Sequence, residues 1–129
     1  MKGLLIMDIN FMKYFTQFKR TCENDILNMT AMVKRAKEYG AITERTFEKC
    51  KQYVADVQKE MKELDEGKEK FLSAVNLIEN PQHQNVIRER LVFCNKWDDV
   101  AENMSLTKKV VRRLFSEALP GFENLLSAA

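Results

Sequence analysis

The chain has 129 residues, of which 45% are hydrophobic and 31% are charged, and its formal net charge at pH 7 is +2. This composition fits one folded domain, or a small domain with a helical extension, and it excludes a generally basic nucleic-acid coat. No apolar stretch approaches the length of a membrane span, and no secretory signal is evident, so we expect a cytoplasmic protein without membrane contact.

The residues that most often carry chemistry are few. Cys22, Cys50 and Cys94 are an odd number of thiols, which predicts free cysteines in a reducing compartment. Together with His83 they lack the close ligand spacing that marks zinc sites. Neither a nucleophile with a matching base nor a glycine-rich phosphate loop is visible, so we expect no metal, no cofactor and no enzymatic activity.

Residues 9–39 predict one long helix. Apolar residues recur there at steps of three and four, and Gly40 is suited to ending the helix in a left-handed conformation. The apolar positions are Phe11, Phe15, Phe18, Cys22, Ile26, Met29, Val33 and Ala36.

A second long helix is predicted to begin after Thr43, a good N-cap residue. Its apolar residues from Phe47 to Ile78 form a heptad seam in which Lys68 is the one charged member, and we expect a bend or loosening near Glu66 and Gly67. The short link of residues 40–43 predicts that the two helices form an antiparallel hairpin. The seam packs within this hairpin or forms a dimer or partner interface, for which the candidates are Phe47, Val54, Val57, Met61, Leu64 and Phe71.

Asn80 and Pro81 mark the next boundary, because asparagine caps helices and proline fits the first helical position. We therefore divide the chain into a helical hairpin arm, residues 1–79, and a C-terminal module, residues 80–129. The module is expected to hold a third helix, a short turn at residues 94–96, a helix over residues 97–104 and another helix after Thr107. Pro120 and Gly121 are expected to end that last helix and leave a short apolar tail.

The last predicted helix carries a concentrated positive charge. Residues 105–116 hold four cations and no anion, and they follow the short helix over residues 97–104 after a break of two residues. A helix, a tight break and a cation-rich second helix are the pattern of a helix-turn-helix that enters a DNA major groove. Candidate DNA-binding residues are Thr107, which also caps the helix, Lys108, Lys109, Arg112, Arg113 and Ser116.

Residues 99–119 read DVAENMSLTKKVVRRLFSEAL, and this string resembles, without a gap, the promoter-reading fourth region of bacterial sigma factors. Residues 78–119, with Trp97 before the motif, are also similar to small phage proteins in which a coiled-coil helix precedes a sigma-like module. These include the ArpU-like and RinA-like late-transcription regulators. The resemblance covers about a third of the chain. It implies that Lys108, Lys109, Arg112 and Arg113 contact DNA.

The chain departs from the sigma pattern at four positions. Ser105 stands where glycine is usual in the turn, and Val110 stands where a polar, DNA-facing residue is common. Phe115 and Glu117 likewise replace polar or basic residues. Val110 and Phe115 add apolar surface, and Glu117 adds a charge that repels phosphate. These features favour a second hypothesis, in which the module binds a protein partner.

The sequence thus predicts an all-α fold, with a long antiparallel, coiled-coil-like helical hairpin and a C-terminal helix-turn-helix module. The expected function is that of a phage or prophage-type DNA-binding transcription regulator, acting as a homodimer on double-stranded DNA. The arm would supply the dimer contact or bind RNA polymerase. The alternatives are a small phage protein that modulates a host protein, such as RNA polymerase or a defence nuclease, and a purely structural assembly protein.

Overall fold

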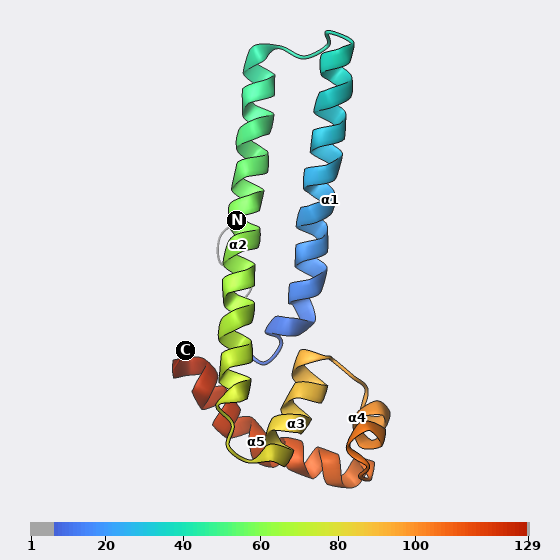
Figure 1. Ribbon diagram of the computed structural model, residues 1–129, viewed down its shortest axis with the longest axis vertical. Coiled ribbons are helices and arrows are strands. Elements are labelled where there is room, and N and C mark those ends of the chain that lie inside the picture. Colours follow the sequence, from blue (N-terminus) through green and yellow to red (C-terminus); the bar gives the residue numbers. More distant parts are fainter. Residues whose placement is uncertain (1–6, 129) are drawn as a thin grey trace.

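The structure, a computed structural model, describes residues 7–128 and is built of helices, with no strand in that range. The prediction of an all-α fold is confirmed for these residues. A π-helical turn, η1 (Arg88–Val92), continues α3 directly. The five α-helices in this range are α1 (Phe11–Glu38), α2 (Glu44–Asn76), α3 (Pro81–Ile87), α4 (Trp97–Met104) and α5 (Lys108–Ala128) (Figure 1).

Local chemistry sets the helix ends near where the sequence predicts them. Gly40 has a φ of +63° and lies directly after the C-cap of α1, where glycine avoids the strain of a side chain. The Thr43 hydroxyl accepts a hydrogen bond from the Thr46 backbone N–H and so caps α2. The Asn80 side chain accepts from the backbone N–H of Gln82 and caps α3. These three predicted signals are confirmed.

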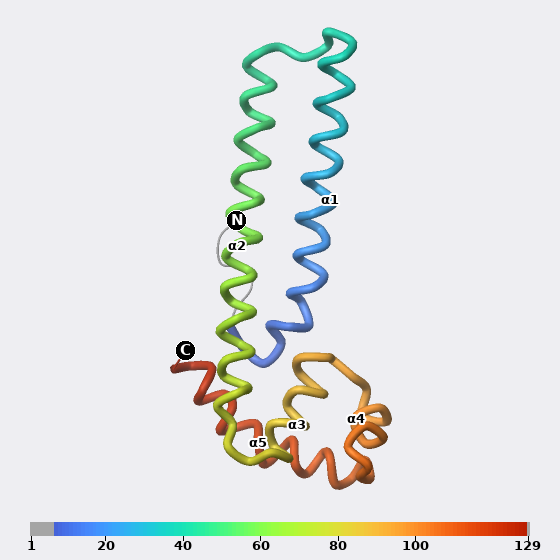
Figure 2. Tube along the Cα trace, in the orientation of Figure 1, coloured from blue at the N-terminus to red at the C-terminus, as the bar shows by residue number. Residues whose placement is uncertain are grey.

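Helices α1 and α2 run antiparallel and side by side, and we call this pair the arm (residues 11–76) (Figure 1). The tube in Figure 2 turns back between them at the end farthest from the rest of the chain, which we call the tip. At the other end, the base, lie α3, η1, α4 and α5, which we call the C-terminal module (residues 81–128). Residues 1–6 and 129, which the predicted two-part division includes, lie outside the described residues.

One hydrophobic core spans the base of the arm and the module. Phe71 of α2 has no exposed surface; its ring stacks on Phe11 of α1, with centroids 6.0 Å apart, and meets Phe122 of α5 edge-on at 5.3 Å. Val86 and Val111 are also fully buried in this cluster. Burial of one such side chain stabilises a fold by about 1.5–3 kcal/mol. The same core therefore holds residues on both sides of residue 80.

Helix α2 runs unbroken through Glu66 and Gly67, near which a bend or loosening was expected, so the helix does not break there. Gly67 instead allows a close approach of two helices. A Cβ atom at this position would lie 2.8 Å from Cζ of Phe11, closer than the two atoms can pack. The missing side chain is thus a packing requirement of the arm, and it does not weaken the helix enough to break it.

The expected end of the last helix at Pro120 and Gly121 is also wrong. Helix α5 continues to Ala128 with Pro120 inside it. Proline removes one backbone donor and costs a helix about 3 kcal/mol. Beyond it, Phe122 is 1% exposed and Leu126 is 4% exposed, and burying two such side chains contributes an amount of the same size or larger. Tertiary packing therefore keeps the chain helical beyond the proline. The residues expected to form an apolar tail form the last turns of α5.

Candidate nucleic-acid interface

The first turns of α5 separate an apolar face from a cationic face. Val111 and Leu114 point into the core, with exposed fractions of 0% and 5%. The opposite side is exposed, and it holds the residues that the sequence predicts for DNA contact: Thr107, Lys108, Lys109, Arg112, Arg113 and Ser116. Residues four apart lie above one another on a helix, so the cations form two adjacent rows on one surface. We call this surface the cationic face of α5.

The link between α4 and α5 is a tight left-handed turn. Ser105 has a φ of 55° and a ψ of 40°, a conformation that glycine adopts at no steric cost but that strains other residues. The backbone N–H of Leu106 donates to the carbonyl of Ala101, and that of Ser105 donates to the carbonyl of Glu102, which closes α4 in a Schellman pattern. Thr107 then caps α5 by accepting from the N–H of Val110 at 3.3 Å, as the sequence predicts.

Trp97 packs within the module, and it lies beside part of the cationic face. Its ring meets Phe115 edge-on, with centroids 5.3 Å apart, so the start of α4 packs on α5. The guanidinium carbons of Arg90 and Arg112 lie 4.6 and 5.7 Å from the Trp97 ring centroid. Arg90 also donates to the backbone carbonyl of Asn95 at 2.8 Å. Contact with the indole limits the freedom of Arg112, which lowers the entropy that a later contact must remove.

Two cations of this face already have partners in the chain. Lys108 Nζ lies 2.9 Å from Asp98 Oδ1, and this hydrogen bond lowers the pKa of the Asp98 carboxyl. Arg113 Nε lies 3.3 Å from Glu117 Oε1, while the other oxygen of that carboxylate is 3.8 Å from His83 Nε2. Lys109 has no ion-pair partner among residues 7–128. Exposed pairs of this kind are weak in water, so the four cations stay accessible to a stronger anion.

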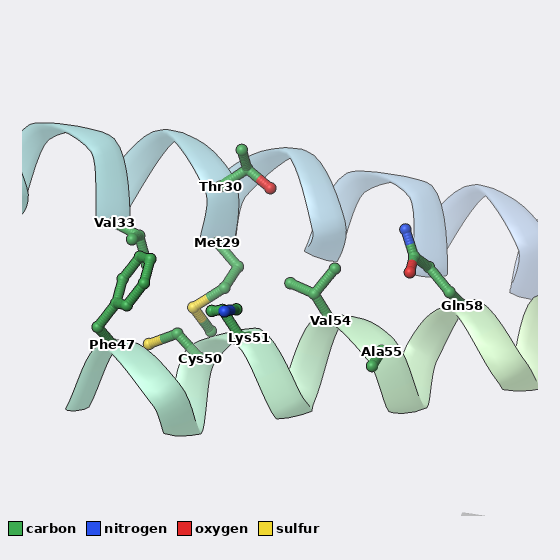
Figure 3. A pocket seen from close by; sticks show the side chains of 9 residues that line it. All are labelled: Met29, Thr30, Val33, Phe47, Cys50, Lys51, Val54, Ala55 and Gln58. Atoms are coloured by element: carbon green, nitrogen blue, oxygen red, sulfur yellow. The ribbon is translucent and has the colours of Figure 1, made fainter. Parts of the chain in front are cut away.

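The residues predicted for a dimer or partner interface lie along the arm. Val57, Leu64 and Phe71 are buried by the chain's own helices. The other three, Phe47, Val54 and Met61, are half-buried. Phe47 and Val54 line an apolar groove of about 290 Å³ between α1 and α2 (Figure 3).

Residues 7–128 offer few other candidate sites. Cys22, Cys50 and Cys94 are free thiols, as predicted. In this part of the chain the His, Cys, Asp and Glu side chains form no group that could hold a metal ion. None of the helices described combines the length and the apolar character that crossing a bilayer requires.

Comparison with protein-family models, with curated proteins and with solved structures finds no significant match to this chain.

The sequence identifies the cations of α5 but does not reveal the residues with which they pair. The pair of Asp98 with Lys108 joins the start of α4 to the start of α5, and the pairing of Arg90 with Trp97 joins η1 to α4. Both depend on the angle between helices, which no spacing along the chain reveals. The only signal was local: Asp98 is an acidic residue in a first helical turn, where the helix dipole favours it.

Proposed function

We propose that the chain is a DNA-binding transcription regulator of the phage or prophage type, in which α4 and α5 act as a helix-turn-helix. The observation that carries the proposal is the cationic face of α5: Lys108, Lys109, Arg112 and Arg113 are exposed together while the opposite side of the helix is buried. This is the division of faces that a recognition helix needs, because it packs on its own domain and presents cations to phosphates and guanine edges.

The remaining parts of the module support the same role. The turn at Ser105 is short, and Thr107 fixes the first turn of α5. The arm then supplies a separate surface for dimerisation or for RNA polymerase, and two modules on two half-sites multiply the affinity of one. The proposal includes action in the cytoplasm, without a cofactor or an enzymatic step.

The test is a titration of duplex DNA by fluorescence anisotropy at several salt concentrations. The variant Arg112→Ala with Arg113→Ala should bind at least about tenfold more weakly, and the slope of log K against log salt should fall by about 2. The variant Lys59→Ala with Lys62→Ala loses the same charge from exposed positions on α2 and should bind like the unchanged protein. Equal binding by both variants would refute the assignment of the cationic face.

A second function is a protein that binds and modulates a host protein. Its support is that Asp98 and Glu117 neutralise two of the four cations, and that Val110 and Phe115 add half-buried apolar surface beside them. This second function requires direct binding to a purified target such as bacterial RNA polymerase, which sedimentation measures. Phe115→Ala should then weaken that complex, and Arg112→Ala with Arg113→Ala should leave binding to duplex DNA unchanged because none occurs.

A further inference from the structure

The distal arm, residues 23–56, has no buried residue of its own. Cys22 on α1 is 5% exposed and Val57 on α2 is 8% exposed, and every position between them along the chain is half-buried or exposed. Two helices cover each other along one line only, so both flanks of their seam face water. The distal arm therefore lacks the further layer that would complete its core.

One flank of the distal arm carries a matched set of apolar and charged residues. Asp25, Met32 and Arg35 lie on one side of α1, at steps of seven and three. Lys49 and Tyr53 lie on one side of α2, and Glu60, seven residues further on and just outside the distal arm, continues that row toward the base. We call these six residues the Tyr53 flank. The Tyr53 hydroxyl donates to Oδ2 of Asp25 at 3.4 Å, which shows that the two rows share one face.

The apolar members of the Tyr53 flank are exposed at its centre. Met32 retains 54% of its accessible surface and Tyr53 retains 42%. Negative charge gathers on the side nearer the base: the Asp25 carboxylate, and to a smaller extent Glu60, raise the pKa of the Tyr53 hydroxyl above its ordinary value.

Charge changes sign along this flank. Arg35 and Lys49 lie near the tip of the arm, and Asp25 and Glu60 lie ten or more residues nearer the base, a separation of about 15 Å along the helices. A surface that is positive at one end and negative at the other is complementary to itself when one copy is reversed.

We propose that the Tyr53 flank binds a second copy of the chain, with the two arms antiparallel. A two-fold axis beside Tyr53 brings Arg35 and Lys49 of one protomer opposite the partner's Asp25 and Glu60, and the reciprocal contact forms at the other end. Met32 and Tyr53 pack across the centre. A parallel arrangement would place like charges opposite each other and is disfavoured.

The size of the flank sets the strength of this dimer. On α1 the distal arm runs from residue 23 to residue 38, a length of about 23 Å, and a face two helices wide buries on the order of 1,000 Å² over both protomers. This buried area is at the lower end of the range for a specific interface. The dimer should accordingly be reversible and should weaken as salt screens the charge pairs.

The test is sedimentation equilibrium of the full chain with three charge variants. Arg35→Glu with Lys49→Glu should raise the dimer dissociation constant by about tenfold or more, because each end then opposes acid to acid. Adding Asp25→Lys and Glu60→Lys to that variant restores opposite charges and should restore the dimer. Lys34→Glu with Lys59→Glu makes the same change in net charge at exposed positions that the Tyr53 flank does not include, and it should leave the constant unchanged.

Four results would overturn the proposal. The first is a protein that stays monomeric at about 100 µM, where a dimer with a dissociation constant in the micromolar range would form. The second is a dimer that withstands Arg35→Glu with Lys49→Glu, and the third is a four-residue exchange that does not restore it. The fourth is a dimer lost through Ala55→Glu: Ala55 lines the groove of Figure 3, so this loss would assign the contact to the opposite flank. None of these readouts involves DNA, so they fail independently of the proposed function.

Discussion

The ring of Phe71 in α2 meets the ring of Phe122 in α5 edge-on, with their centroids 5.3 Å apart, and this contact fastens the arm to the last helix of the chain. Phe122→Ala should lower the free energy of unfolding by about 3–5 kcal/mol, because it opens a cavity in the shared core. Urea denaturation followed by circular dichroism measures this loss.

Leu77 provides the matched control, since it is 64% exposed at the end of α2 and Leu77→Ala should change stability by no more than about 0.5 kcal/mol. Because the core is shared, the arm and the module should unfold in one transition. Two separated transitions in the unchanged protein would contradict the packing described here.

Ser105 is a serine in a left-handed conformation, so replacing it with glycine should stabilise the protein. We expect Ser105→Gly to raise the free energy of unfolding by about 1 kcal/mol, because glycine adopts this φ without the clash of a Cβ atom. Ser105→Ala keeps the Cβ atom and should give no gain. If both variants had equal stability, the turn would not be strained at this residue.

Asp98 should titrate below the ordinary range of an aspartate. The hydrogen bond and the charge of Lys108 lower the pKa of its carboxyl, so the pair persists above that pKa and is lost as the pH falls through it. The carboxyl carbon shift of Asp98, followed by NMR from pH 2 to pH 7, reports this directly. Lys108→Ala should move the pKa upward, whereas Lys70→Ala, on α2, should not.

Neutralising the two acids of the cationic face should strengthen DNA binding. Asp98→Asn and Glu117→Gln each free a cation that now has a partner, and each should raise affinity for duplex DNA about two- to fivefold at low salt. Glu66→Gln with Glu69→Gln makes the same total change of charge on α2 and should have little effect. Unchanged affinity in the first pair would favour the protein-binding function.

The thiol of Cys22 should react slowly. Burial raises its pKa above the ordinary value of a thiol, and the carboxylates of Glu60, Asp25 and Glu23 raise it further. The thiolate is the reactive form, so at pH 8 alkylation of Cys22 should lag far behind that of exposed Cys94. Mass spectrometry of the labelled peptides measures both rates in one sample. Comparable rates would mean that the arm opens readily around Cys22.

The sequence allowed reliable prediction where one residue decides a local structure. Thr43 and Asn80 cap helices by bonding to backbone groups two or three residues away, so their roles need no knowledge of the fold. Pro120 and Gly67 misled the prediction for the opposite reason. Their local preference is outweighed by contacts with residues elsewhere, namely the buried side chains beyond Pro120 and the Phe11 ring against Gly67.

The candidate site likewise has a part that the local sequence predicts and a part that depends on the fold. The four cations and the cap at Thr107 lie within seven consecutive residues, so the sequence alone predicts them. Two partners of those cations, Asp98 and Trp97, come from another helix, and they become visible only when the turn at Ser105 fixes how α4 crosses α5.

The core around Phe71 has a mechanical consequence. Helix α2 alone has 33 residues, so the arm is about 50 Å long. The base of this helix packs directly against α5 through the rings of Phe71 and Phe122. A force applied at the tip of the arm would therefore reach, through these packed rings, the helix that bears the lysines and arginines.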